Sequence, residues 1–308
     1  MIAWLRLIRA ALAPTIAWDV LAGLLACTPA IAHAGGDGGG VSLGDPFQAR
    51  FLWPLAALLC AYHGGMALND WADRHIDREA GRRRPLVDGS LPPAAGLALA
   101  LVLLGTSAAI LMLVLDGDAQ RLGLMLLGAV AVYDLGGATV REHLGPVLLA
   151  VCRSISLVLA PVWVLGMDGF AQAAGPLPVL AYALYFLFAS RLAQREEQGL
   201  PGMRALPFLM MAGATPFLLL ADGSGSLFVL PAWLLLVAWL LVPAWPLRHQ
   251  TWSPAQVQAA VRRCLVAAPL VPAMALLAWP PQPGIAWALG GPAAALLAAV
   301  AARRLAPE

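Results

Sequence analysis

Long apolar runs separated by short charged segments dominate the chain. A helix needs about 20 mostly apolar residues to cross a bilayer. Ten stretches come near that length, at residues 14–34, 51–70, 93–115, 121–138, 146–167, 176–193, 204–221, 227–247, 261–279 and 285–302. The fourth stretch and the last two meet the requirement least well. The pattern predicts an all-α, polytopic transmembrane helical bundle of nine or ten spans, with residues 1–308 forming a single domain.

Composition agrees with that pattern. Of 308 residues, 61% are hydrophobic and only 12% are charged, and the mean hydropathy is +0.78. A water-soluble domain does not need so much apolar surface. The four cysteines all lie in apolar segments without CxxC spacing, so we expect them to pack rather than to form disulfides or bind a metal. The chain is therefore expected to contact membrane lipid, and no nucleic acid.

The placement of arginines predicts the orientation. Loops that face the cytoplasm carry an excess of basic residues. If the N-terminus is cytoplasmic, all of the 19 basic residues except Arg50, Arg121 and Arg153 lie inside or at the inner ends of spans. An even number of spans follows, which fits ten better than nine. We expect a prokaryotic-type inner (cell) membrane, with both termini and the charged segment after the second span in the cytoplasm.

That charged segment, residues 69–89, departs most from the apolar pattern. Asp70, Asp73 and Asp77 are spaced three and four apart, so on a helix they project from one face. Carboxylates so close together repel one another unless cations bridge them, and clustered oxygen ligands suit Mg²⁺, which is commonly shared with substrate phosphates. Arg82, Arg83 and Arg84 follow, and guanidinium groups pair well with phosphate oxygens. The segment predicts a magnesium–diphosphate site; the alternative is a solvated charged loop between two spans.

The same segment resembles the first aspartate-rich motif of the UbiA superfamily of intramembrane prenyltransferases. The motif reads NDxxDxxxD followed by Arg-Pro-Leu-x-x-Gly. It is matched here by Asn69, Asp70, Asp73, Asp77, Arg84, Pro85, Leu86 and Gly89. The resemblance implies a bundle around a central cavity with a charged cytoplasmic cap. It also implies that the three aspartates bind Mg²⁺ and the diphosphate of a polyprenyl donor, which Asn69 orients.

The second motif of the superfamily is degenerate in this chain. Family members end span 6 with DxxxD, but Arg191 and Arg195 stand at those positions here. Glu196 and Glu197 are one helical step away and are candidate replacements for one metal ligand. Alternatively, the two arginines contact the diphosphate and balance the charge that a second metal would carry. A basic helix end that only obeys the positive-inside rule is the remaining alternative.

A third resemblance covers spans 4 and 5, where Tyr133-Asp134 is followed by Gly145-Pro146 and Cys152-Arg153. Arg141 is the candidate for the basic residue that the family places soon after the tyrosine. A charge inside a span usually faces a cavity or a partner. We expect Arg153 to meet the diphosphate or Asp134, with a purely structural buried pair as the alternative, and Asp19 of span 1 to face the mouth of the cavity.

Together these features predict Mg²⁺-dependent transfer of a polyprenyl group from a prenyl diphosphate to a lipophilic acceptor, of the aromatic or quinone-precursor class. The expected catalytic residues are Asn69, Asp70, Asp73 and Asp77, and of these the three aspartates are the expected metal ligands, with Glu196 and Glu197 as further candidates. The expected substrate contacts are Arg82, Arg83, Arg84, Tyr133, Arg141, Arg153, Arg191 and Arg195. The alternatives are a catalytically inactive relative that carries or scaffolds a lipophilic metabolite, and a transporter. A CDP-alcohol phosphotransferase is discounted, because its order of Asp-Gly and Ala-Arg ahead of further aspartates is missing.

Overall fold

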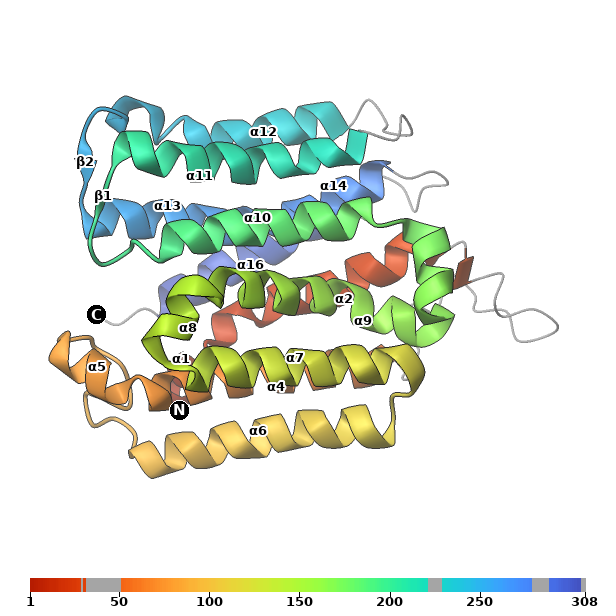
Figure 1. The fold of residues 1–308 in the computed structure, drawn as a ribbon, viewed down its shortest axis with the longest axis horizontal. Helices are drawn as coiled ribbons and strands as arrows, with labels where there is room; N and C mark the ends of the chain where they lie inside the picture. Colours follow the sequence, from red (N-terminus) through yellow and green to blue (C-terminus); the bar gives the residue numbers. More distant parts are fainter. Residues whose placement is uncertain (29, 32–50, 221–228, 279–287, 306–308) are drawn as a thin grey trace.

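The computed structural model describes residues 1–28, 30–31, 51–220, 229–278 and 288–305. Helices make up almost all of this part of the chain and lie side by side along the long axis of the molecule (Figure 1). The first half contains α1 (Ile2–Leu7), η1 (Ala10–Leu12), α2 (Ala13–Ala26), α4 (Leu52–Ala72), α5 (Arg74–Glu79), α6 (Pro93–Leu113), α7 (Gly117–Leu135) and α8 (Gly137–His143). The second half contains α9 (Gly145–Ala174), α10 (Leu177–Ala193), β1 (Leu200–Pro201), α11 (Gly202–Ala214), η3 (Thr215–Leu220), α12 (Val229–Leu241), η4 (Trp245–Leu247), β2 (Thr251–Trp252), α13 (Pro254–Ala267), α14 (Leu270–Ala278) and α16 (Gly290–Leu305).

The expected all-α membrane bundle is confirmed in outline. In the described residues, five helical segments are long and apolar enough to cross a membrane: Pro93–Leu113, Gly145–Ala174, Gly202–Leu220, Val229–Leu247 and Pro254–Ala278. Two shorter apolar helices, Ala10–Ala26 and Leu177–Ala193, accompany them. The helices α4 and α7 fall outside this group: α4 carries Asp70 near its C-terminal end, and α7 carries Asp118 and Arg121 near one end and Asp134 near the other. The choice between nine and ten spans therefore stays a prediction.

Helix is present in each of the ten predicted ranges, but several boundaries differ. In the first predicted span, 14–34, the helix α2 ends at Ala26. Residues 29 and 32–34 of that range lie outside the described part of the chain. The predicted range 146–167 matches the first part of α9: the element runs over Gly145–Ala174 but is interrupted by a kink at Gly166. At Gly166 its backbone leaves the helical region, with φ 69° and ψ 173°, a conformation that a residue without a Cβ adopts easily.

The charged connections gather at one end of the bundle. Figure 1 places α5, α8 and the β1–β2 pair at the same end as α1. The two short strands pair antiparallel, Leu200 opposite Trp252, and so join the segment after α10 to the segment before α13. At Gly199 (φ 71°) an added Cβ would lie 2.5 Å from the carbonyl oxygen of Trp252, so the close approach requires glycine. The link holds residues 194–199 against this end.

Two apolar clusters hold the bundle together. The larger one runs through most of the helices and is centred on α2, α9, α10 and α14. The smaller one lies directly beneath the charged end and consists of Leu7, Ala67, Leu68, Leu86, Leu91 and Ala100. Because it joins α1, α4, α6 and the loop after α5, this small cluster fixes the backbone on which the charged side chains stand.

Candidate functional site

The aspartate-rich segment spans a junction between two helices. The helix α4 ends at Ala72, Asp73 caps it with φ −84° and ψ −2°, and α5 begins at the next residue. The hydrogen bonds from Asp73 N to Asn69 O and from Asp77 N to Asp73 O keep the i to i+4 pattern across the junction. Asp70, Asp73 and Asp77 thus share a face, as predicted, and all three are buried.

A tight turn after α5 returns the chain toward these aspartates. The amides of Val87 and Asp88 both donate to the carbonyl of Arg84, and Gly89 takes the left-handed conformation with φ 83°. Leu86 is 2% exposed and fills the space over Gly96, where an added Cβ would lie 2.8 Å from it. The turn is therefore anchored by apolar packing, which holds Arg84 over the acids.

Arginines surround the two outer aspartates. Arg84 bridges them, with Nη1 2.6 Å from Oδ1 of Asp70 and 3.0 Å from Oδ2 of Asp77. Arg82 donates to Oδ1 of Asp77 at 2.5 Å, and Arg9 approaches Oδ1 of Asp70 at 3.4 Å. These arginine side chains are 24–41% exposed while the two carboxylates are almost fully buried. The charge of the acids is thus balanced by cations that reach them from the solvent side.

The middle aspartate and the α10–α11 loop join the same cluster. Arg141, from α8, donates to Oδ2 of Asp73, and this hydrogen bond raises the pKa of Arg141 above its ordinary value. Arg82 also forms an ion pair with Glu197. Burial raises the pKa of Glu196, which Arg9, Arg262 and Arg82 partly oppose. We call the group formed by Asp70, Asp73, Asp77 and their paired arginines Arg9, Arg82, Arg84 and Arg141 the cap.

Some polar atoms of the cap have no hydrogen-bond partner. They are Oδ1 of Asp73, Oδ2 of Asp77 and Nε of Arg141, all buried. Oδ2 of Asp77 is within ion-pair distance of Arg84 but accepts no hydrogen bond. Within the described part of the chain, no three His, Cys, Asp or Glu side chains lie close enough together to hold a metal ion. Each aspartate is paired with arginine instead of sharing one centre.

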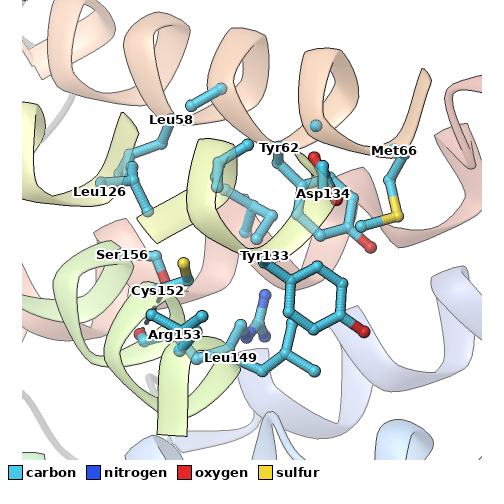
Figure 2. A pocket seen from close by; sticks show the side chains of 15 residues that line it. Leu58, Tyr62, Met66, Leu126, Tyr133, Asp134, Leu149, Cys152, Arg153 and Ser156 are labelled. Carbon is cyan, nitrogen blue, oxygen red and sulfur yellow. Dashed lines mark hydrogen bonds between the residues drawn. The ribbon is translucent and has the colours of Figure 1, made fainter. Parts of the chain in front are cut away.

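An apolar cavity opens beside the cap, between α2, α4, α7 and α9 (Figure 2). It encloses about 620 Å³, counting the space at its open side. Leucines, valine, isoleucine and methionine form most of its wall, together with Tyr62 and Tyr133. Asp134 lies at the boundary between the two regions: it lines the cavity, hydrogen-bonds to Asn69 and interacts electrostatically with Arg141 and Asp73.

Deeper in the bundle lies a second polar group, here called the interior cluster: Asp19, Arg153, Ser156 and Tyr182. Nη2 of Arg153 is 3.1 Å from Oδ2 of Asp19 and donates to the Tyr182 hydroxyl at 2.9 Å. Asp19 accepts hydrogen bonds from Tyr182 at 2.6 Å and from Ser156 at 2.7 Å. The guanidinium also lies 4.8 Å from the ring centroid of Phe186. Both carboxylate oxygens are satisfied, as a buried charge requires.

The interior cluster corrects two expectations. Arg153 pairs with Asp19 and not with Asp134, and Asp19 is fully buried instead of facing the mouth of the cavity. The structure therefore shows the alternative named above for Arg153, a buried ion pair with a structural role. This pairing has no signal within a single span, because α2 and α9 pack together only in the folded bundle. Arg153 nevertheless lines the cavity.

The remaining predicted residues lie around the cap or beyond it. Tyr133 lines the cavity near Arg141, and Arg83 is exposed. Arg191 contacts Gln194 and the carbonyl of Glu142, while Arg195 contacts Gln198. Contact with substrate stays a prediction for these residues and for all the other substrate-binding residues predicted from the sequence.

Sequence reasoning left two residues out of the site. Arg9 lies 61 positions from Asp70 in sequence, yet the two side chains meet. Its backbone is left-handed, with φ 49°, unusual for a side chain with a Cβ. The sequence indicates Asp134 only as a partner for Arg153. Its placement next to a motif tyrosine was the one available signal.

These features define a class: a helical membrane protein with an aspartate–arginine cap over an apolar cavity. The chain matches the model of the UbiA prenyltransferase family over residues 24–262, and it belongs to that family. A UbiA homolog from Archaeoglobus fulgidus bound to GPP and Mg²⁺ has a similar fold, with a TM-score of 0.50 and 14% identity, covering 94% of this chain and 99% of that chain.

A second structure of a UbiA homolog from Archaeoglobus fulgidus, bound to DMAPP and Mg²⁺, matches with a TM-score of 0.48 and 14% identity over the same shares of the two chains. The first likeness, at 14% identity and a TM-score of 0.50, speaks for the fold alone. No curated protein sequence matches this chain significantly.

Proposed function

We propose that this protein transfers a prenyl group from a prenyl diphosphate to a lipophilic acceptor of the aromatic or quinone-precursor class, with Mg²⁺ as cofactor and the cap facing the cytoplasm. The observation that carries the proposal is the position of the cap. Three buried carboxylates and their arginines stand at the edge of an apolar cavity between membrane-type helices. A molecule with an anionic head and a hydrocarbon tail complements both parts. Family membership supports the same reaction class.

The cap offers carboxylate oxygens of the kind that Mg²⁺ binds, although in the described residues no three of them are gathered around one centre. Mg²⁺ prefers carboxylate and phosphate oxygens and retains several waters, so it needs few protein ligands. Oδ1 of Asp73 and Oδ2 of Asp77 are buried acceptors without a hydrogen bond, and Asp70 is the third candidate ligand, with Glu196 and Glu197 as further candidates. When bound, Mg²⁺ would stabilise negative charge on the departing diphosphate.

The arginines of the cap have a matching role. Arg82 and Arg84 are partly exposed, so their guanidinium groups can turn from aspartate to phosphate oxygens and form charge-assisted hydrogen bonds. Arg141 would contact the diphosphate from α8 in the same way. We assign lesser substrate contacts to Arg83, Arg191 and Arg195. Asn69, which hydrogen-bonds to Asp134, would orient the donor where cap and cavity meet.

The cavity wall protects the reaction from water. Departure of diphosphate leaves an allylic cation, which water would capture. Apolar side chains exclude water, and the faces of Tyr62 and Tyr133 can stabilise a cation. The cap thus promotes ionisation while the cavity directs the carbocation to the acceptor.

The test is diphosphate release from radiolabelled geranyl, farnesyl and geranylgeranyl diphosphates by purified protein, with Mg²⁺ or EDTA and a panel of aromatic acceptors. We expect Mg²⁺-dependent release and a prenylated product, both reduced about 10²–10³-fold by Asp73→Ala. Donor binding without turnover would instead favour the second candidate, an inactive carrier or scaffold. The observation that favours that candidate is the pairing of every cap aspartate with arginine, together with arginines at the second motif.

A further inference from the structure

A second concentration of arginine lies in the C-terminal part of the chain, apart from the cap. From residue 198 to 305 the sequence has a single acid, Asp222, which lies outside the described residues. In the described part of this stretch no arginine is within ion-pair distance of an acid, whereas the four arginines of the cap all are. Arg262 interacts electrostatically with Glu196, so its charge is partly balanced. The six arginines of the stretch are Arg204, Arg248, Arg262, Arg263, Arg303 and Arg304.

Three of these arginines come from segments that meet near the C-terminal end of α12. Gly202, the first residue of α11, packs so closely against the segment after η4 that an added Cβ would lie 2.9 Å from the carbonyl oxygen of Arg248. Arg204 stands two residues further on, in the first turn of α11. The indole of Trp239 on α12 donates to the carbonyl of Arg263 on α13 at 3.3 Å. Cations from α11, α13 and the segment after η4 are therefore grouped around one end of one helix.

The side chain of Arg248 is oriented by a tryptophan. Cζ of Arg248 lies 5.1 Å from the ring centroid of Trp245, and Nη1 donates to the carbonyl of Trp245 at 3.0 Å. A guanidinium has five N–H donors, so this hydrogen bond leaves others available. The side chain of Trp245 is 52% exposed, and its indole N–H makes no hydrogen bond within the described residues. The stacked pair thus presents charged and neutral donors that suit the oxygens of a phosphate group.

An apolar surface adjoins these donors. The helix α12 lies at the edge of the bundle (Figure 1), and only 22% of its membrane-type segment, Val229–Leu247, is buried. Its exposed side chains are apolar along its length and include Leu234, Leu235 and Val242. Tryptophan side chains such as those of Trp239 and Trp245 are typical of the boundary between hydrocarbon and headgroups. A ligand that fits both surfaces has an anionic head and hydrocarbon chains.

We propose that Arg248 and Trp245 bind the headgroup of an anionic phospholipid in the leaflet on the side of the cap, with the acyl chains along α12. Their N–H groups donate to the phosphate oxygens, while Arg204 and Arg263 add positive charge. A zwitterionic headgroup fits less well, because its ammonium group would meet arginines and, in the described residues of this stretch, no acid. Basic sites between transmembrane helices are suited to anionic headgroups. The inference does not depend on the reaction proposed for the cap.

The experiment is native mass spectrometry of the full-length protein, freed of lipid in detergent and titrated with dioleoylphosphatidylglycerol or dioleoylphosphatidylcholine. We expect the first phosphatidylglycerol to bind at least about tenfold more tightly than phosphatidylcholine, since each arginine close to anionic headgroups contributes about fivefold. The double variant Arg248→Gln/Arg263→Gln should lose this preference. Trp245→Leu keeps an apolar side chain but removes the ring and the indole N–H, and it should reduce the preference about threefold.

The matched control is Arg303→Gln/Arg304→Gln, which removes two exposed arginines from the last turn of α16 and the same amount of charge. It should keep the preference for phosphatidylglycerol. Equal binding of the two lipids by the native protein would refute the site. Equal loss of the preference in both double variants would show a general attraction to positive charge and would also overturn the inference. An excess of glycerol 3-phosphate should not displace the bound lipid; displacement would indicate a soluble phosphate ligand instead of a phospholipid.

Discussion

The cap and the interior cluster both contain ion pairs between aspartates and arginines, but the hydrogen bonding and burial of these residues differ. In the interior cluster, Asp19 is fully buried and both of its oxygens accept hydrogen bonds. In the cap, Asp73 and Asp77 each keep one buried oxygen without a hydrogen bond, and their arginines are partly exposed. Asp19 therefore has no free acceptor for a ligand, whereas the cap aspartates can exchange their arginines for other partners.

This difference separates a structural charge pair from a functional one. A buried ion pair offsets its cost of desolvation only when hydrogen bonds satisfy the remaining polar atoms. The interior cluster meets that condition at both oxygens of Asp19, while Nε of Arg153 stays without a hydrogen-bond partner in the described residues. The cap does not, so a ligand that offers both a cation and phosphate oxygens can improve on the arginine pairing. Proximity of opposite charges alone would not distinguish the two sites.

The interior cluster should be the more sensitive of the two to loss of its acid. Asp19→Ala leaves Arg153 buried without its counter-ion, so we expect a loss of about 3–5 kcal/mol in the free energy of unfolding, measured by equilibrium unfolding in detergent. Asp118→Ala, at an exposed ion pair with Arg121, is the control and should cost less than about 1 kcal/mol. A small effect at Asp19 would mean that the interior cluster is not a closed structural pair.

The cap should show the opposite behaviour, with activity lost and the fold retained. Asp73→Ala should reduce kcat about 10²–10³-fold, because an oxygen ligand for the metal–diphosphate group is removed. The unfolding transition should move little, since Arg141 can turn toward solvent. Asp88→Ala, at an exposed position of the same segment, is the matched control. Full activity of Asp73→Ala would remove the cap from the mechanism.

A substitution of Arg84 tests whether the cap aspartates exchange arginine for Mg²⁺ when the arginine turns to the diphosphate. Arg84→Ala should weaken binding of a prenyl diphosphate analogue about 10–100-fold, as expected for hydrogen bonds to a charged group. Binding of Mg²⁺ alone should become tighter, because Asp70 and Asp77 lose the cation that they share. Titration calorimetry measures both, with Arg78→Ala, at an exposed site nearby, as the control. Unchanged or weaker Mg²⁺ binding would contradict the exchange.

Glu197 should give the smallest effect. Its ion pair with Arg82 is at the surface, with the Glu197 side chain 63% exposed, and such pairs contribute less than about 1 kcal/mol. Glu197→Gln should therefore alter stability and kcat only slightly in the same two assays. A loss of activity comparable to that of Asp73→Ala would instead identify Glu197 as a metal ligand, a role that its position next to the degenerate second motif allows.

Local features of the site were predictable from sequence, and long-range pairings were not. The spacing of Asp70, Asp73 and Asp77 is local, and the structure keeps them on one face. Contacts of Asp19 with Tyr182, 163 positions away, depend on how α2 and α10 sit against α9. The left-handed backbone of Arg9, which brings it to Asp70, likewise has no signature in a hydropathy pattern. The apolar pattern of the sequence identifies the helices but does not show which helices pack against one another.

The most direct test of the exchange is a calorimetric titration of geranyl thiodiphosphate into the purified protein, with Mg²⁺ and with EDTA. If the cap acids give up arginine for a metal–diphosphate group, the analogue should bind at least about tenfold more tightly with Mg²⁺, as positive coupling between the two ligands requires. Asp73→Ala should remove that dependence on Mg²⁺. Equal affinity with Mg²⁺ and with EDTA would contradict the account.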